Sequence, residues 1–330
     1  MLTGRLHTLV IDSKVLAGNP LGDPARRELP VYLPPAAEPR GLPVVLVLAG
    51  FTGVGAGQLR GTPWEPSFPE RFERLLAAGR CAPAAFVFPD AFTRFGGSQY
   101  MNSAGTGRYE DHLLDEVLPL VEREFGVGGA RARCGVMGKS SGGYGALHLC
   151  LEHPDRFAAL ASHSGDCAFD LCYRGDFPRL LAQLDKHGSV EAFVAAFEQA
   201  PRKGSALVLA MNVLAMAAAY SPEPAEPLGV ALPIEPRTGR LRPQVWERWL
   251  RHDPVERARR HGERLRDFRL VYVDAGLRDE YALQYGARQL VDALREKGVA
   301  VHHEEFDDGH MGVSYRYEAS LPLITRALSP

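Results

Sequence analysis

The sequence predicts an α/β fold in which helices flank a mostly parallel sheet and a helical cap is inserted late in the chain. Short apolar runs alternate with amphipathic stretches in the first half and again in the last sixty residues. The run 43–49 is apolar almost throughout, as expected of a strand buried on both faces. Residues 165–267 carry helical patterns only. We therefore expect a sheet domain from residues 1–164 and 268–330, and a cap from residues 165–267.

Each element is predicted from the spacing of its apolar residues and from the glycine and proline residues at its ends. The segments 6–16 and 27–33 are expected to be antiparallel strands at the sheet edge. Further strands are expected at 43–49, 84–88, 132–137, 157–162, 269–273 and 301–306. Helices of the sheet domain are expected at 69–78, 109–124, 143–152, 281–297 and 314–328. The cap should hold helices at 177–187, 189–198, 206–220 and 243–251, with a proline-rich joint at 221–236.

Charge and composition argue against a polyanionic partner. The 330 residues include 38 Lys plus Arg and 40 Asp plus Glu, so no long-range field of one sign is available to attract nucleic acid or an anionic membrane. The sequence has no signal-peptide pattern and no apolar run long enough to span a membrane, which predicts a cytoplasmic protein. A small-molecule substrate is favoured, and a homodimer is left open.

Three groups of side chains receive structural interpretations. The arginines near residue 260 alternate with acidic residues, which predicts the solvated face of one helix; they are Arg257, Arg259, Arg260, Arg264 and Arg266. Five cysteines without a paired framework predict free thiols, with a Cys167–Cys172 bridge as the alternative. Neighbouring His302, His303, Glu304 and Glu305 would point to opposite faces of a strand, and no HExxH motif occurs. We expect no metal and no other cofactor.

The motif that carries chemistry is Gly138-Lys139-Ser140-Ser141-Gly142, which directly follows an expected strand and precedes an expected helix. A turn from strand to helix this sharp accepts only small residues beside the serine, and it leaves the Ser140 hydroxyl exposed above the sheet. The motif resembles the end of a phosphate-binding loop, but Arg133 stands where that loop needs its first glycine. Ser140 is therefore predicted to be a nucleophile.

A serine nucleophile needs a general base and an acid that orients it. In the α/β-hydrolase fold the order is serine, acid, histidine, with the histidine after the last strand. His310 follows the last expected strand between two glycines and is the predicted base. Asp279 is the predicted acid, because it lies beyond the turn glycine that follows the preceding strand. The other carboxylates receive other roles: Asp274 ties its loop to backbone amides, Glu280 opens the next helix, and Asp307 and Asp308 are runners-up.

An oxyanion hole needs two backbone amides aimed at the developing negative charge. In this fold one belongs to the residue after the nucleophile and the other to the loop after the third strand. These positions are Ser141 and Phe51, with Thr52 as the alternative if the loop register differs by one.

Together these motifs resemble the putative-esterase family of α/β-hydrolases, which includes S-formylglutathione hydrolases, feruloyl esterases, enterochelin esterases and mycolyltransferases. The resemblance extends over the sheet portions through the following residues: Ala49-Gly50-Phe51, Pro89-Asp90, the run from Ser98 to Ser103, Asp274-x-Gly276-x-x-Asp279 and Gly309-His310. Two positions depart from the family pattern, since Lys139 and Ala49 stand where many members have histidine.

The resemblance implies hydrolysis of a carboxylic ester through an acyl-enzyme, with Ser140, Asp279 and His310 in the catalytic places. An acyltransferase or a thioesterase would use the same triad. A catalytically inactive binding module with this fold is the alternative from another class. Tyr100, Asn102 and Trp246 are candidates for substrate binding; the other large cap residues form either a pocket or the core of the cap itself, and they are Phe177, Met211, Met216 and Trp249.

Overall fold

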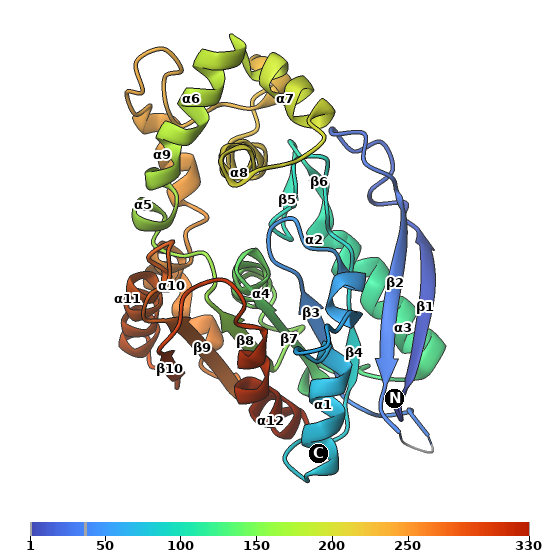
Figure 1. Ribbon diagram of the computed structural model, residues 1–330. Helices are drawn as coiled ribbons and strands as arrows, with labels where there is room; N and C mark the ends of the chain where they lie inside the picture. Colours follow the sequence, from blue (N-terminus) through green and yellow to red (C-terminus); the bar gives the residue numbers. More distant parts are fainter. Residues whose placement is uncertain (1, 36–37, 330) are drawn as a thin grey trace.

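The computed structural model describes residues 2–35 and 38–329, and within them eight strands form one mixed sheet (Figure 1). The order of the strands is β1-β2-β4-β3-β7-β8-β9-β10. Their bounds are β1 Arg5–Asp12, β2 Arg26–Leu33, β3 Val44–Leu48, β4 Ala85–Val87, β7 Cys134–Lys139, β8 Ala159–His163, β9 Leu270–Gly276 and β10 His302–Phe306. The β1–β2 and β2–β4 pairs are antiparallel and the other pairs are parallel, which confirms the predicted α/β-hydrolase architecture.

Helices cover both faces of the sheet. One face carries α1 (Phe68–Ala77) and α12 (Tyr317–Leu328), which contact each other. The other face carries α2 (Tyr109–Asp111), α3 (Leu118–Phe125), α4 (Ser141–Glu152), α10 (Pro254–His261) and α11 (Leu283–Glu296). Two of these helices have clear start or stop signals. Ser67 and Glu70 form a capping box at the start of α1, and α3 ends at Gly126, whose φ is +68°.

Strand β3 illustrates how one short sequence fills both sides of the sheet. All five of its residues, Val44 to Leu48, are buried. Val44, Leu46 and Leu48 belong to the hydrophobic cluster under α3, α4 and α11, whereas Val45 and Val47 belong to the cluster under α1 and α12. This alternation is the period-2 pattern of a strand with two buried faces. The apolar run therefore fixes β3 as a central strand.

The helices in the middle of the chain lie above the sheet in Figure 1. Their buried side chains form most of a hydrophobic cluster distinct from the two that cover the sheet. Its helices are α5 (Phe169–Cys172), α6 (Phe177–His187), α7 (Val190–Gln199), α8 (Ser205–Tyr220) and α9 (Pro243–Leu250). The helix that follows, α10 (Pro254–His261), contacts α4 and α11. Its Val255 and Ala258 belong to the hydrophobic cluster between the sheet and the helices α3, α4 and α11. Although the sequence assigned residues 165–267 to the cap as a whole, the last cap residues of this cluster lie near Leu250, and Tyr144 of α4 and Leu283 of α11 join it from the sheet domain.

The interpretation of Arg257 as a solvated residue was wrong. Its side chain is buried, donates to Nδ1 of His148 at 2.7 Å, and pairs with the carboxylate of Glu152. His148 in turn bonds to Glu110 through Nε2 at 2.6 Å. The arginine therefore ties α10 to α4, which periodicity could not reveal because its partners lie about a hundred residues away.

Two local features also differ from the prediction. The expected helix at 109–124 contains a π-helical segment, His112–Val117, which leads into Pro119. Proline has no amide hydrogen to donate, and in an α-helix its ring clashes with the carbonyl group four residues earlier. The wider π-helical turn before Pro119 relieves this clash. A small hairpin, β5 (Asn102–Ser103) with β6 (Gly107–Arg108), was not predicted. Two-residue strands are too short to show a period.

The described residues contain neither a membrane-spanning helix nor a disulfide bond. No helix among them is long and apolar enough to cross a membrane. All five cysteines are free and buried, which confirms the prediction of free thiols over a Cys167–Cys172 bridge.

Candidate active site

The predicted site residues meet at the carboxyl ends of the parallel strands. Ser140 follows β7, Phe51 follows β3, Asp279 follows β9 and His310 follows β10. In an open α/β sheet the loops at this edge form the crevice where ligands bind. Helix α8 lies over the same edge, because its residues line the cavity that contains Ser140 and His310 (Figure 1).

Ser140 lies in a strained turn between β7 and α4. Its φ and ψ are 56° and −127°, a conformation that a residue with a side chain rarely adopts. The glycines beside it have no room for a side chain, since a Cβ at Gly142 would lie 2.1 Å from the carbonyl oxygen of Leu48. The backbone amide of Ser140 donates to the carbonyl of His163 at 2.9 Å. The turn therefore holds Ser140 above the sheet as predicted from the glycine spacing.

The structure brings Ser140, His310 and Asp279 into one chain of hydrogen bonds. His310 Nε2 lies 3.0 Å from Ser140 Oγ, and His310 Nδ1 lies 2.8 Å from Asp279 Oδ2. With the proton on Nδ1, the imidazole donates to Asp279 and accepts from the serine hydroxyl. The other carboxylate oxygen of Asp279 accepts from the amide of Tyr281 at 2.9 Å, so both oxygens are occupied. The Asp279 side chain has no exposed surface, and His310 is 4% exposed.

Glu280 holds the histidine loop, a role that the sequence did not indicate. Its carboxylate accepts a hydrogen bond from the backbone amide of His310 at 2.7 Å, and it packs against Gly309. Helix α11 begins only at Leu283, so the prediction that Glu280 opens that helix was wrong. A side chain that bonds to a loop thirty residues away leaves no local pattern in the sequence.

Asp274, on β9, contacts side chains rather than backbone amides. It is fully buried and bonds to His163 Nδ1, the Tyr272 hydroxyl and Arg316 Nε, each at 2.9 Å. Burial raises its pKa, but His163 and Arg316 together lower the pKa below its usual range. The prediction that Asp274 ties its loop to amides was wrong, because β9 continues to Gly276 and His163 is its register neighbour on β8.

The loop after β3 lies directly against Ser140. A Cβ at Gly50 would approach Ser140 Cβ to 3.4 Å. The amide of Thr52 is already used, since it donates to the carbonyl of Gly96 at 2.9 Å. Ser141 is the first residue of α4, where an amide has no partner within its own helix. The geometry therefore favours the amide of Phe51 over that of Thr52 as the partner of the Ser141 amide.

The three candidates for substrate binding lie away from the cavity that contains Ser140. Tyr100 is buried and donates to the carbonyl of Ala49 at 2.7 Å, so it supports the loop after β3 from behind. Asn102 is exposed on β5 and bonds to Asp111. Trp246 is buried in the cap cluster, where its indole donates to Asp170 at 3.1 Å. None of the three lines the cavity that contains Ser140.

Two adjoining cavities open beside Ser140. One, of about 160 Å³, is lined by Ser140 and His310 together with Asp166, Asp176, Tyr173 and Tyr281. The other, of about 310 Å³, is mostly apolar and is lined by Phe92, Phe95, Phe197 and Met211. Phe51, Thr52 and Val208 line both, so the two cavities share a wall. Of the large cap residues named from the sequence, Met211 therefore lines a cavity; Phe177, Met216 and Trp249 lie in the cap core.

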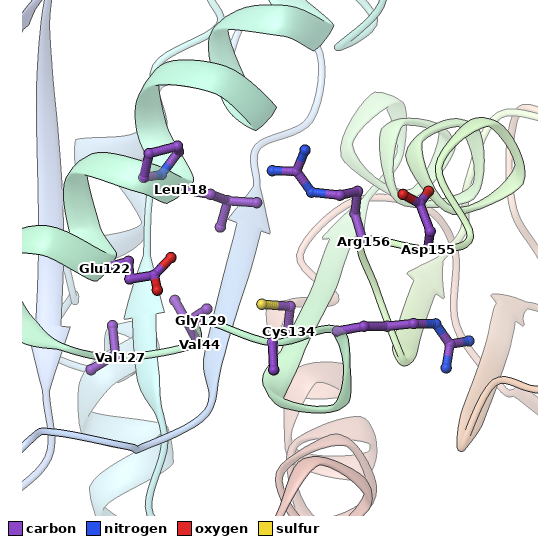
Figure 2. A pocket seen from close by; sticks show the side chains of 11 residues that line it. Val44, Leu118, Glu122, Val127, Gly129, Cys134, Asp155 and Arg156 are labelled. Atoms are coloured by element: carbon purple, nitrogen blue, oxygen red, sulfur yellow. The ribbon is translucent and has the colours of Figure 1, made fainter.

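A further cavity, of about 200 Å³, lies at the other end of the sheet (Figure 2). Val44 and Cys134, which begin β3 and β7, line it together with Glu122 and Arg156. It is thus separated from Ser140 by the length of the strands. It does not belong to the candidate active site.

Lys139 and Asp166 complete the charged groups near Ser140. Burial lowers the pKa of Lys139, and the carboxylates of Asp279 and Glu280 oppose that change. Asp166 follows β8 at the same edge of the sheet; sequence reasoning missed it, although its place just after a parallel strand was a usable signal. Within residues 2–35 and 38–329, no three His, Cys, Asp or Glu side chains are grouped to hold a metal ion.

Comparison with known proteins identifies one family and several solved structures that the chain is similar to. A profile described as "Putative esterase" matches residues 24–327. A ferulic acid esterase structure is 21% identical, has a TM-score of 0.61 and matches 100% of both chains. The fluorophosphonate-binding serine hydrolase FphF of Staphylococcus aureus is 15% identical, with a TM-score of 0.61 and 99% of each chain covered. An S-formylglutathione hydrolase from Agrobacterium tumefaciens is 15% identical, with a TM-score of 0.60, covering 100% of this chain and 97% of that one.

Proposed function

Because this chain belongs to the putative esterase family, we propose that it hydrolyses a small carboxylic ester through an acyl-enzyme formed on Ser140. The observation that carries the proposal is the continuous chain of hydrogen bonds from Ser140 through His310 to Asp279. A serine hydroxyl is a poor nucleophile at neutral pH, and this arrangement is the one that activates it.

In the proposed reaction, His310 Nε2 takes the proton of Ser140 as Oγ attacks the ester carbonyl. Asp279 keeps the imidazole in the productive tautomer and stabilises the imidazolium that forms. Its carboxylate is well prepared for this role, since it is fully buried and already fixed by the amide of Tyr281. His310 then gives the proton to the leaving alcohol, and a water activated by the same imidazole releases the acid.

The negative charge on the carbonyl oxygen would be stabilised by the amides of Phe51 and Ser141. Thr52 is less suitable because its amide already donates to Gly96. The amide of Ser141 also lies at the amino end of the twelve-residue helix α4, where the helix dipole favours an anion. Both donors belong to the backbone, so they persist whatever side chains occupy the two positions.

Replacement of Ser140 by alanine tests the proposal. With p-nitrophenyl butyrate as the substrate, we expect Ser140→Ala to lower kcat by about 10⁴-fold or more. A fluorophosphonate probe should add its mass to the wild type and not to Ser140→Ala. Ser205→Ala, on the exposed start of α8, is the matched control and should behave as the wild type in both assays. Near-normal turnover or labelling of Ser140→Ala would overturn the assignment.

The same acyl-enzyme could pass its acyl group to an alcohol, or could form from a thioester. Adding methanol to the assay distinguishes transfer from hydrolysis, because transfer yields the methyl ester instead of the acid. The alternative of an inactive binding module predicts neither turnover nor labelling by the fluorophosphonate probe.

A further inference from the structure

Two carboxylates line the cavity that contains Ser140. They belong to Asp166 and Asp176, and no lysine or arginine is among the residues that line the cavity. Three aromatic side chains, Phe51, Tyr173 and Tyr281, complete much of the wall. Negative charge together with aromatic faces favours a cation over a neutral or anionic group.

Of the two carboxylates, only Asp176 is paired with a cation. Asp176 accepts from Arg179 Nε at 2.9 Å, so its charge is countered within its own helical segment. No lysine, arginine or histidine of the described chain lies within ion-pair distance of the Asp166 carboxylate. Asp166 is also buried, with 8% of its surface exposed. An uncompensated carboxylate at this depth is costly unless neutral donors, a counter-ion or a ligand stabilises it.

Neutral donors hold Asp166 from one side only. The Tyr173 hydroxyl, the Ser141 hydroxyl and Gln99 Nε2 donate to it at 2.9, 3.1 and 3.2 Å. All three bonds end on Oδ2, so they do not occupy Oδ1. Gln99 is fixed in turn by the Tyr220 hydroxyl, 2.8 Å from its Nε2. The network therefore fixes the carboxylate in position and leaves one of its oxygens available to a group in the cavity.

Asp166 is also close to the reacting atoms. Its partner Ser141 follows the nucleophile in the chain and supplies one of the amides proposed for the oxyanion. Asp166, Ser140 and His310 line the same cavity, whose volume is about 160 Å³. A group held at Asp166 would thus belong to the same small molecule whose carbonyl lies over Ser140.

We propose that Asp166 is a specificity residue that selects esters carrying an ammonium group. The inference rests on the proposed esterase function and names its substrate class. The ammonium group would occupy the cavity beside Asp166, close to Tyr173 and Tyr281. The apolar part of the same molecule would extend past Phe51 into the adjoining cavity, whose wall is mostly aromatic and aliphatic.

Two esters of equal shape test the charge requirement. Butyrylcholine and 3,3-dimethylbutyl butyrate differ only in a quaternary nitrogen that replaces a quaternary carbon. We expect the wild type to favour the choline ester in kcat/KM by at least about tenfold. Asp166→Asn keeps the size and one acceptor oxygen, and it should reduce that preference, the ratio of the two kcat/KM values, by about tenfold or more. Asp185→Asn removes one exposed carboxylate of α6 and should keep the wild-type preference.

The proposal is overturned if Asp166→Asn keeps the wild-type preference, or if Asp185→Asn loses it to the same extent. Inhibition of the wild type provides a measurement that does not depend on the folding of a variant. Choline should inhibit hydrolysis of p-nitrophenyl butyrate more strongly than 3,3-dimethylbutan-1-ol does, and equal inhibition would also overturn the proposal. If the fluorophosphonate probe labels Ser140 but the choline ester is not preferred, only the substrate class is wrong. Absence of labelling would instead refute the esterase function itself.

Discussion

Replacing Glu280 with alanine should slow the reaction without removing any group of the triad. The Glu280 carboxylate accepts from the backbone amide of His310 at 2.7 Å and packs against Gly309, so it fixes the loop that carries the base. A hydrogen bond to a charged partner contributes about 1.5 to 3 kcal/mol. If that energy holds His310 in its productive position, its loss corresponds to about a 10- to 100-fold decrease in kcat.

The conservative variant separates positioning from charge. Glu280→Gln keeps an oxygen that can accept from the His310 amide, and a neutral hydrogen bond still contributes about 1 kcal/mol. We therefore expect Glu280→Gln to retain most of the turnover that Glu280→Ala loses. The KM for p-nitrophenyl butyrate should change little in either variant, since Glu280 does not line the cavity beside Ser140.

Steady-state hydrolysis of p-nitrophenyl butyrate gives kcat and KM for the wild type and both variants. Glu296→Ala removes an exposed carboxylate at the end of α11 and is the matched control. Urea unfolding of each variant shows whether a lower kcat reflects global destabilisation. The reasoning is refuted if Glu280→Ala keeps kcat within about twofold of the wild type, or if Glu280→Gln loses as much as Glu280→Ala.

Three other predictions concern the acid of the triad, a second buried carboxylate and the apolar cavity. Asp279→Asn should lower kcat by about 10³-fold or more with little loss of stability. Asp274→Asn should instead lower mainly the free energy of unfolding, by about 3 kcal/mol, because it disrupts a buried ion-pair network. A larger loss of kcat from Asp274→Asn than from Asp279→Asn would show that Asp274 is the acid of the triad. Asp253 lies directly before α10, where its buried carboxylate accepts from the backbone amides of Ala168, Phe169 and Val255. Burial raises the pKa of Asp253 to about 6, so its stabilising contribution is present at low pH and is lost as the pH rises through that value. Relative to Asp253→Asn, the wild type should therefore lose about 1 kcal/mol of unfolding free energy between pH 5 and pH 8 in urea titrations, and a gain would contradict the reasoning. Met211→Trp should fill part of the apolar cavity and lower kcat/KM for p-nitrophenyl octanoate by about tenfold relative to the acetate, and an unchanged ratio would place the acyl chain elsewhere.

Most of the fold could be predicted from the sequence, because its signals are local. The apolar run of β3 is explained by burial on both faces, and the glycines around Ser140 are explained by a turn that has no room for side chains. The order of serine, acid and histidine then identified which three side chains meet, although they are spread over 170 residues. The strands that precede them, β7, β9 and β10, are parallel strands of one sheet, so their carboxyl ends lie at the same edge.

Other roles depended on contacts between residues far apart in the chain. Glu280 bonds to a loop thirty residues later, Asp274 to a histidine on the neighbouring strand, and Arg257 to a helix about a hundred residues earlier. In each case the sequence shows only a charged residue near an element boundary, which local patterns interpret as a cap or a solvated face.

The sequence by itself therefore determined the α/β-hydrolase fold and the residues predicted to perform the chemistry, because hydrophobic periodicity and glycine spacing act within single elements. Only the tertiary structure decided which carboxylates support the histidine, which loop amide is free beside Ser140, and which side chains line the cavity. These depend on how loops from different strands come together. The same reason explains why Asp166 lines the cavity that contains Ser140, whereas Tyr100, Asn102 and Trp246 do not.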